Sequence, residues 1–205
     1  TGTNIKRTYR GHVRGTEPFY MNGSTETPIG PYSVSDIDWN GQATGSAQFK
    51  SPLTWATVLS GDGYATYASS TTSNRGELIE TAYDDIGRMY RKNKFAIDTS
   101  SGVKGNSLQT DTYYDRRGQV VATQVAFQAG SEFAYDGAGR AYQTRTVIDL
   151  KSTKYSSGAY VYRDPQPQST MSSMSGGDDG VLTLSHSVFS GSGNVTELHA
   201  FDINH

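Results

Sequence analysis

The sequence predicts an all-β fold built from consecutive β-hairpins, and two observations support this prediction. The first is the composition, in which 23 glycines, 24 serines and 23 threonines accompany 14 tyrosines, 7 phenylalanines and 2 tryptophans among 205 residues. Such a chain lacks the leucine and alanine stripes of a helical bundle, whereas threonine, tyrosine and valine suit a pleated, half-wet surface. The second observation is a short motif that recurs along the chain.

The motif consists of an aromatic residue, Asp, two free positions, Gly, and then Arg or Gln. The three copies that keep this pattern are Tyr83, Asp84, Gly87 and Arg88; Tyr114, Asp115, Gly118 and Gln119; and Tyr135, Asp136, Gly139 and Arg140. Weaker copies lie at 37–42, with isoleucine in the aromatic position, and at 189–194, which lacks the Asp. Repetition of this kind indicates an array of small supersecondary units.

Each copy predicts one β-hairpin. Residues 79–83 alternate with the period of a strand, and Asp then begins a tight turn in which its carboxylate accepts backbone N–H groups. Gly occupies the fourth turn position, where a positive φ costs it nothing, and a second strand follows, as at 119–125. Because one hairpin is marginal alone in water, the copies are expected to join edge to edge into a curved or spiralling antiparallel sheet.

The motif also predicts how a leucine-poor sheet is held together. The tyrosines fall at equivalent places on successive hairpins, where rows of rings bury area. The Arg of each motif can lie over such a ring or pair with a neighbouring Asp.

The chain divides into two regions by this pattern. Residues 1–36 hold turn signals but no motif, which predicts an irregular β-rich lead-in or insertion. Residues 37–205 form a degenerate repeat array with loop insertions, and the pattern is strongest over 78–146. Within this array, residues 164–180 are of low complexity and predict an exposed loop.

The motif copies resemble the YD repeats of the Rhs family, in which Tyr-Asp, two free residues and Gly-Arg recur. This resemblance implies a large secreted or cell-surface protein whose repeats wind into a β-ribbon around a hollow interior. The chain is then a structural segment of a longer protein, in the wall of a shell or of a surface filament. The implied partners are neighbouring repeats of the same chain or further copies of it, and an enclosed polypeptide or surface glycans.

Charge and composition exclude several other classes. With 18 basic and 20 acidic residues the net charge is −2, so no basic field points to nucleic acid. No apolar run approaches the roughly 20 residues of a membrane helix, and the absence of cysteine excludes disulfides and thiolate metal sites.

The sequence predicts no enzymatic activity, no cofactor and no metal site. No serine lies in a Gly-x-Ser-x-Gly elbow, and none of the four histidines has metal-pair spacing. Asp36, Asp38, Asn40 and Gly41 match the first half of a calcium loop, but Ala47 stands where the bidentate acid belongs, so a turn is favoured.

Two alternatives to a structural segment remain open at this point. One is a carbohydrate-binding or adhesion module, because exposed rings stack on sugars; its candidate residues are Trp39, Trp55, Tyr64 and Tyr67. The other is a hydrolase on a β-scaffold, which would need a cleft joining His199 to an acid. Glu197 and Asp202 lie nearby, but we expect alternation of strand faces to weaken such a site.

Overall fold

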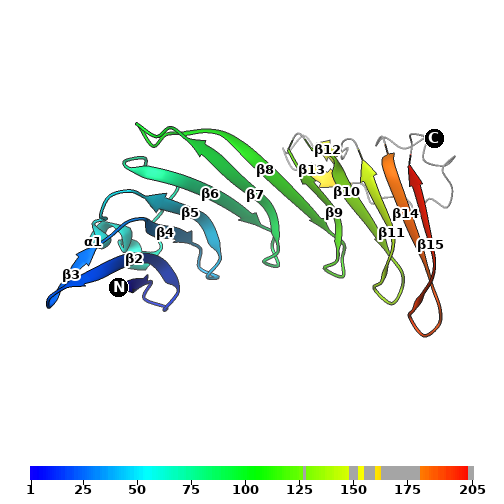
Figure 1. The fold of residues 1–205 in the computed structure, drawn as a ribbon, viewed down its shortest axis with the longest axis horizontal. Coiled ribbons are helices and arrows are strands. Elements are labelled where there is room, and N and C mark those ends of the chain that lie inside the picture. Colours follow the sequence, from blue (N-terminus) through cyan, green and yellow to red (C-terminus); the bar gives the residue numbers. More distant parts are fainter. Residues whose placement is uncertain (127, 148–151, 155–159, 163–180, 203–205) are drawn as a thin grey trace. The chain divides into compact units, whose positions relative to one another are not determined.

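The computed structural model describes residues 1–126, 128–147, 152–154, 160–162 and 181–202. The predicted all-β class is confirmed: thirteen strands of this part of the chain pair antiparallel in one sheet (Figure 1). The predicted loop at 164–180 lies outside the described residues. The chain forms two compact units, Thr1–Gln109 and Thr110–His205, each described here by itself. The predicted division after residue 36 stays a prediction.

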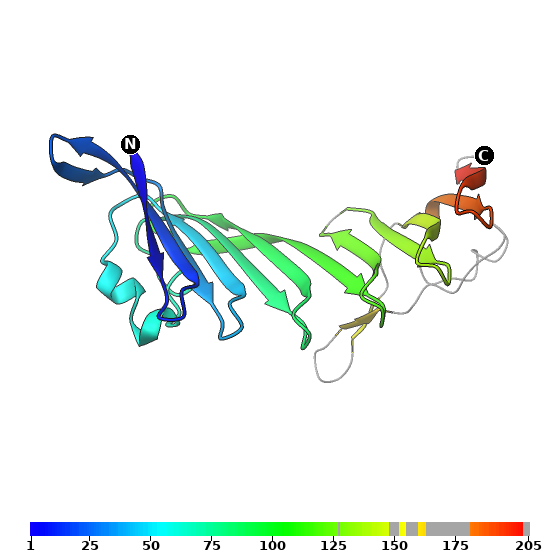
Figure 2. The same cartoon turned by 90° about the horizontal axis from the view of Figure 1, so that it is seen from below.

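The first unit is an antiparallel sheet with two short helices on one face (Figure 2). Its elements are β1 (Gly2–Arg7), β2 (Val13–Asn22), β3 (Thr25–Pro28), β4 (Tyr32–Ile37), β5 (Ala43–Phe49), α1 (Trp55–Val58), η1 (Gly61–Gly63), β6 (Arg75–Tyr83) and β7 (Met89–Ile97). The strands follow the order β1-β2-β4-β5-β6-β7, and β3 pairs with β2. Strand β8 (Lys104–Tyr114) begins in this unit and ends in the second.

The core of the first unit lies between the sheet and the segment 50–74, which carries the helices. Strand β4 alternates, with Tyr32 and Val34 buried and Ser33 and Ser35 half-buried, as one covered sheet face requires. Phe49 of β5 and Leu78 of β6 lie on the same side, and Val58 of α1 covers them from the segment. Segment 50–74 thus supplies the apolar cover that a leucine-poor sheet lacks.

The second unit is a series of hairpins with a smaller core. Its elements are β9 (Val120–Val125), β10 (Gly130–Tyr135), β11 (Ala141–Val147), β14 (Val181–Phe189) and β15 (Val195–Asp202), which follow β8 in sheet order, and the separate pair β12 (Ser152–Lys154) and β13 (Tyr160–Tyr162). Ala122, Val147 and Leu184 form the buried cluster, and Tyr113 packs against it. The Glu132 and Arg145 side chains pair beside this cluster, almost fully buried.

Candidate functional site

The motif turns share one hydrogen-bond pattern. In the turn at Asp84, the backbone N–H of Gly87 donates to the Asp84 carbonyl over 2.9 Å, and the Asp84 N–H donates to the Arg88 carbonyl. The Asp84 Oδ1 atom accepts the N–H groups of Ile86 at 3.2 Å and Arg88 at 2.8 Å. The turns at Asp115 and Asp136 repeat this pattern. The Asp therefore satisfies donors that the turn would otherwise leave to water.

The motif glycine has a positive φ in each turn, as predicted. The values are 86° at Gly87, 86° at Gly118 and 82° at Gly139. In each hairpin the strand register shifts by one residue at the motif aromatic, as between Ala82 and Tyr83. A turn closed by a left-handed glycine with a bulge is a common three-residue hairpin loop, which explains why this position is glycine.

The two weaker copies form the same turn. Asp38 Oδ1 accepts the N–H groups of Asn40 and Gln42, so residues 38–41 form the turn that the sequence favours. In the copy that lacks Asp, the Ser190 hydroxyl accepts the Asn194 N–H at 3.1 Å, and Gly193 has a φ of 88°. A serine thus replaces the aspartate at this one turn.

The last motif position takes one of two roles. Where it is arginine, the side chain returns to its own turn: the Nε atoms of Arg88 and Arg140 each lie 2.7 Å from the Oδ2 atom of the motif Asp. Arg140 also lies over the Phe189 ring, 4.5 Å from its centroid, so this arginine fulfils both predicted contacts. The arginine therefore closes its own hairpin, and Arg140 also contacts an aromatic ring of the next one.

Where the last position is glutamine, the side chain reaches the next hairpin. Gln42 Nε2 donates to the Gly87 carbonyl over 2.9 Å, and Gln119 Nε2 donates to the Gly139 carbonyl over 3.0 Å. Both acceptors are motif glycines of the following turn. The glutamine therefore ties two successive turns together.

The motif tyrosine makes a second tie in the opposite direction. The Tyr83 hydroxyl donates to the Ala43 carbonyl at 3.2 Å, and the Tyr135 hydroxyl donates to the Val120 carbonyl at 2.8 Å. Each acceptor directly follows the glutamine of the preceding motif. Burial raises the pKa of both tyrosines, and the negative charge of the preceding turn's Asp raises it further. The glutamine hydrogen bond and the tyrosine hydrogen bond connect the same two successive hairpins, and we call the two bonds together a joint.

The hairpins also meet in one register. Across adjacent hairpins, the residue four positions after a motif glycine pairs with the residue three positions before the next motif aromatic. The three observed pairs are Gly45 with Glu80, Ala122 with Glu132, and Gln143 with His186. The motif glycines of these hairpins are separated by 46, 21 and 54 residues. The register is therefore independent of the length of the connecting segment.

The four candidate sugar-binding rings do not form one surface. Trp39 and Tyr64 stack with ring centroids 4.4 Å apart and planes 20° apart. Trp55 is half-buried beneath the Lys6 ammonium, and its Nε1 atom is buried without a hydrogen-bond partner. Tyr67 is half-buried against Phe49. The structure brings two of the four residues together and places the other two at the core.

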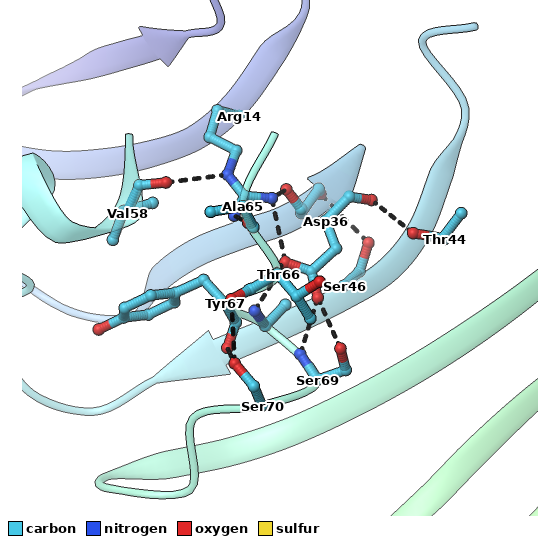
Figure 3. Close-up of polar contacts among 12 residues, drawn as sticks. Arg14, Asp36, Thr44, Ser46, Val58, Ala65, Thr66, Tyr67, Ser69 and Ser70 are labelled. Atoms are coloured by element: carbon cyan, nitrogen blue, oxygen red, sulfur yellow. Dashed lines mark hydrogen bonds and ion pairs between the residues drawn. The ribbon is translucent and has the colours of Figure 1, made fainter. Parts of the chain in front are cut away.

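Sequence reasoning missed a buried carboxylate that anchors segment 50–74 (Figure 3). Asp36 accepts the backbone N–H groups of Tyr67, Ala68 and Ser69 at 2.7–2.9 Å, and the Ser69 hydroxyl at 2.7 Å. Arg14, which is fully buried, donates to Asp36 at 3.0 Å.

Arg14 fixes the same segment at two further points. Its guanidinium donates to the backbone carbonyls of Ser35, Val58 and Ala65. Burial alone would raise the pKa of Asp36, but the hydrogen bonds from residues 67–69 outweigh it and hold that pKa below its ordinary value. Both carboxylate oxygens of Asp36 accept hydrogen bonds from segment 50–74, so this carboxylate anchors the segment to the sheet.

His199 lies on an exposed face of β15. Its Nε2 atom is 3.1 Å from Glu197 Oε2, and about half of its side chain is exposed. Residues two apart on a strand share a face, so the expectation that alternation would separate this pair is wrong. Within the described residues, no group of three or more potential metal-ligating side chains occurs. In the same part of the chain, neither helix has the length and apolarity to span a bilayer.

Comparisons with known proteins do not assign this chain to a family. No family model matches the sequence, and no curated protein matches it. Among solved structures, the chain is similar to one in the crystal structure of TcdB2-TccC3-Cdc42, with 13% identity and a TM-score of 0.37. The alignment covers 98% of this chain and 9% of that chain, so this chain spans a small part of its length.

Proposed function

We propose that this chain is a non-enzymatic structural segment of a longer, secreted or cell-surface protein of the YD-repeat kind. It builds the wall of a hollow β-shell or surface filament, which encloses a polypeptide or mediates contact. The observation that carries the proposal is the repeated inter-hairpin register, with joints at Gln42 and Gln119. A chain that joins hairpins identically across connections of different length is suited to extending a sheet.

The chemistry of the motif turns supports a structural role over a catalytic one. Each motif Asp accepts two backbone N–H groups, and Asp84 and Asp136 also pair with their arginines. In Asp84 and Asp136 these hydrogen bonds lower the pKa of the carboxyl group and favour its ionised form. A general acid or base instead needs a carboxylate whose pKa lies near the working pH.

Electron microscopy of the full-length protein that carries this chain tests the proposal. A closed hollow particle or a continuous tube is expected, whereas small isolated globules would refute it. The joint variant Gln42→Ala with Tyr83→Phe should lower the fraction of intact particles. Gln48→Ala is the matched control, because Gln48 is an exposed glutamine on β5 that takes no part in a joint.

A carbohydrate-binding or adhesion role is the second candidate, and one surface cluster favours it. Tyr9 and Trp39 are 61% and 59% exposed, and their rings meet edge to face with centroids 6.5 Å apart. A glycan array tests this role: Trp39→Ala should abolish binding, whereas Trp55→Ala should act only through stability. Equal loss of binding in both variants at equal folded fraction would count against the cluster.

A further inference from the structure

Three segments far apart in the sequence meet at one exposed aromatic corner in the first unit. Tyr9 comes from the turn between β1 and β2, Trp39 from the turn after β4, and Tyr64 from the end of η1. The Tyr9 ring stands at 70° to Trp39 and 77° to Tyr64, which are stacked on each other. The corner therefore has two walls that are close to perpendicular.

The Arg10 guanidinium lies in this corner. Its central carbon is 5.5 Å from the centroid of Tyr9 and 5.2 Å from that of Trp39, within the range of cation–π attraction. Its Nε atom also donates to the Tyr9 hydroxyl over 2.9 Å. Two rings and one hydrogen bond thus orient a side chain that is otherwise exposed.

Within the described part of the chain, the outer half of this guanidinium has no partner. Among the described residues, its two terminal nitrogens donate no hydrogen bond, and no carboxylate forms an ion pair with Arg10. By contrast, Arg14 and Arg75 use their terminal nitrogens on backbone carbonyls or a carboxylate. A guanidinium offers a planar pair of N–H donors that matches a carboxylate, and holding it in place lowers the entropy lost on binding.

The corner itself is anchored to the fold. The Tyr64 hydroxyl lies 3.1 Å from His12 Nδ1 and accepts a hydrogen bond from Thr8 at 3.4 Å. The Tyr9 N–H donates to the Asp62 carbonyl over 3.2 Å. The walls therefore stay in place when the Arg10 side chain is changed.

We infer that this corner binds a carboxylate-bearing saccharide, with Arg10 pairing the carboxylate and the exposed rings of Tyr9 and Trp39 contacting the sugar. The inference rests on the carbohydrate-binding role named above as the second candidate. It adds the ligand class, an acidic sugar, and the residue that selects it. Charge complementarity between Arg10 and the ligand favours an acidic sugar over a neutral one.

The test is a glycan array of matched pairs, each an acidic oligosaccharide and its methyl-esterified, uncharged counterpart. The acidic member should bind more tightly by a factor on the order of ten, as one charge-assisted hydrogen-bonded pair allows. Arg10→Gln should remove this preference, so that both members of a pair bind with equal affinity, and Arg10→Lys should retain part of the preference. Arg116→Gln, an exposed arginine in the second unit, is the matched control and should change neither affinity.

The outcomes distinguish failure of the acidic-sugar inference from failure of the carbohydrate-binding role on which it rests. Equal affinity for both members of every pair overturns the acidic-sugar inference and leaves the carbohydrate-binding role standing. Binding of no glycan overturns both. Binding of sulfated glycans or of a polyglutamate peptide, without binding of carboxylated sugars, overturns the inference in favour of that other ligand.

Discussion

Removing the Asp36 carboxylate is expected to release segment 50–74 from the sheet. Asp36→Ala would leave the Arg14 guanidinium buried without its counter-charge and would free three backbone N–H groups. Asp36 is 5% exposed and Arg14 is 0% exposed, so water does not reach this pair in the folded chain. Breaking a buried ion pair on one side costs about 3–5 kcal/mol. We therefore expect a loss of about 4 kcal/mol in the free energy of unfolding.

The matched control for this variant is Asp38→Ala, two residues along. Asp38 accepts two backbone N–H groups in its turn but forms no buried ion pair, so its removal should cost no more than about 2 kcal/mol. Urea denaturation followed by circular dichroism gives both free energies. Hydrogen exchange reports the segment directly, because the amides of residues 67–69 should lose protection in Asp36→Ala alone. Equal costs for the two variants, with these amides still protected, would refute the reasoning.

The same carboxylate gives a pH dependence of known sign. Because its folded pKa is lowered, the stability from Asp36 is complete above the ordinary aspartate pKa of about 4. That stability is lost as the pH falls through the lowered folded pKa. Acid titration of the wild type and of Asp36→Ala should therefore converge at low pH, and curves that stay parallel would contradict this account.

Three further predictions concern the motif turns. Gly139→Ala places a side chain at a φ of 82° and its Cβ 3.0 Å from Gln119, so it should lower the free energy of unfolding by about 1–2 kcal/mol, measured by thermal unfolding. Gly137→Ala, with open space around its Cβ, is the control and should change that free energy by almost nothing. Tyr135→Phe removes one hydrogen bond of a joint and should cost about 1 kcal/mol in urea, and no change would argue against the joint. The pKa of Asp84 and of Asp136 is lowered by hydrogen bonds from the arginine's backbone and side chain, so both should titrate by NMR below a typical aspartate; an ordinary value would contradict the Arg contact.

The motif turns could be predicted because their interactions are local. The Asp side chain, the left-handed glycine and the strand that follows all lie within six residues, so their pattern in the sequence specifies the turn. This locality also allowed the weak copy at 37–42 to be recognised although it lacks the aromatic residue. The turn at Ser190 shows the same rule with a hydroxyl in place of the carboxylate.

The two roles of the last motif position could not be predicted in the same way. Arginine was expected to pair with Asp or lie over a ring, and Arg140 does both. Glutamine was counted as a substitute for arginine, whereas Gln119 reaches the next hairpin. Contacts of this kind join residues of different hairpins, and a single copy of the motif does not specify them.

The all-β class, the hairpin unit and the motif turns follow from the amino-acid sequence, because each depends on contacts between near neighbours. The residues that meet across long separations become visible in the folded chain alone. Arg14, Asp36 and residues 67–69 carry no shared motif, and their network forms because segment 50–74 folds back over the sheet. Tyr9, Trp39 and Tyr64 likewise gather at one corner through the pairing of strands. Such contacts depend on the path of the whole chain, which a local pattern does not encode.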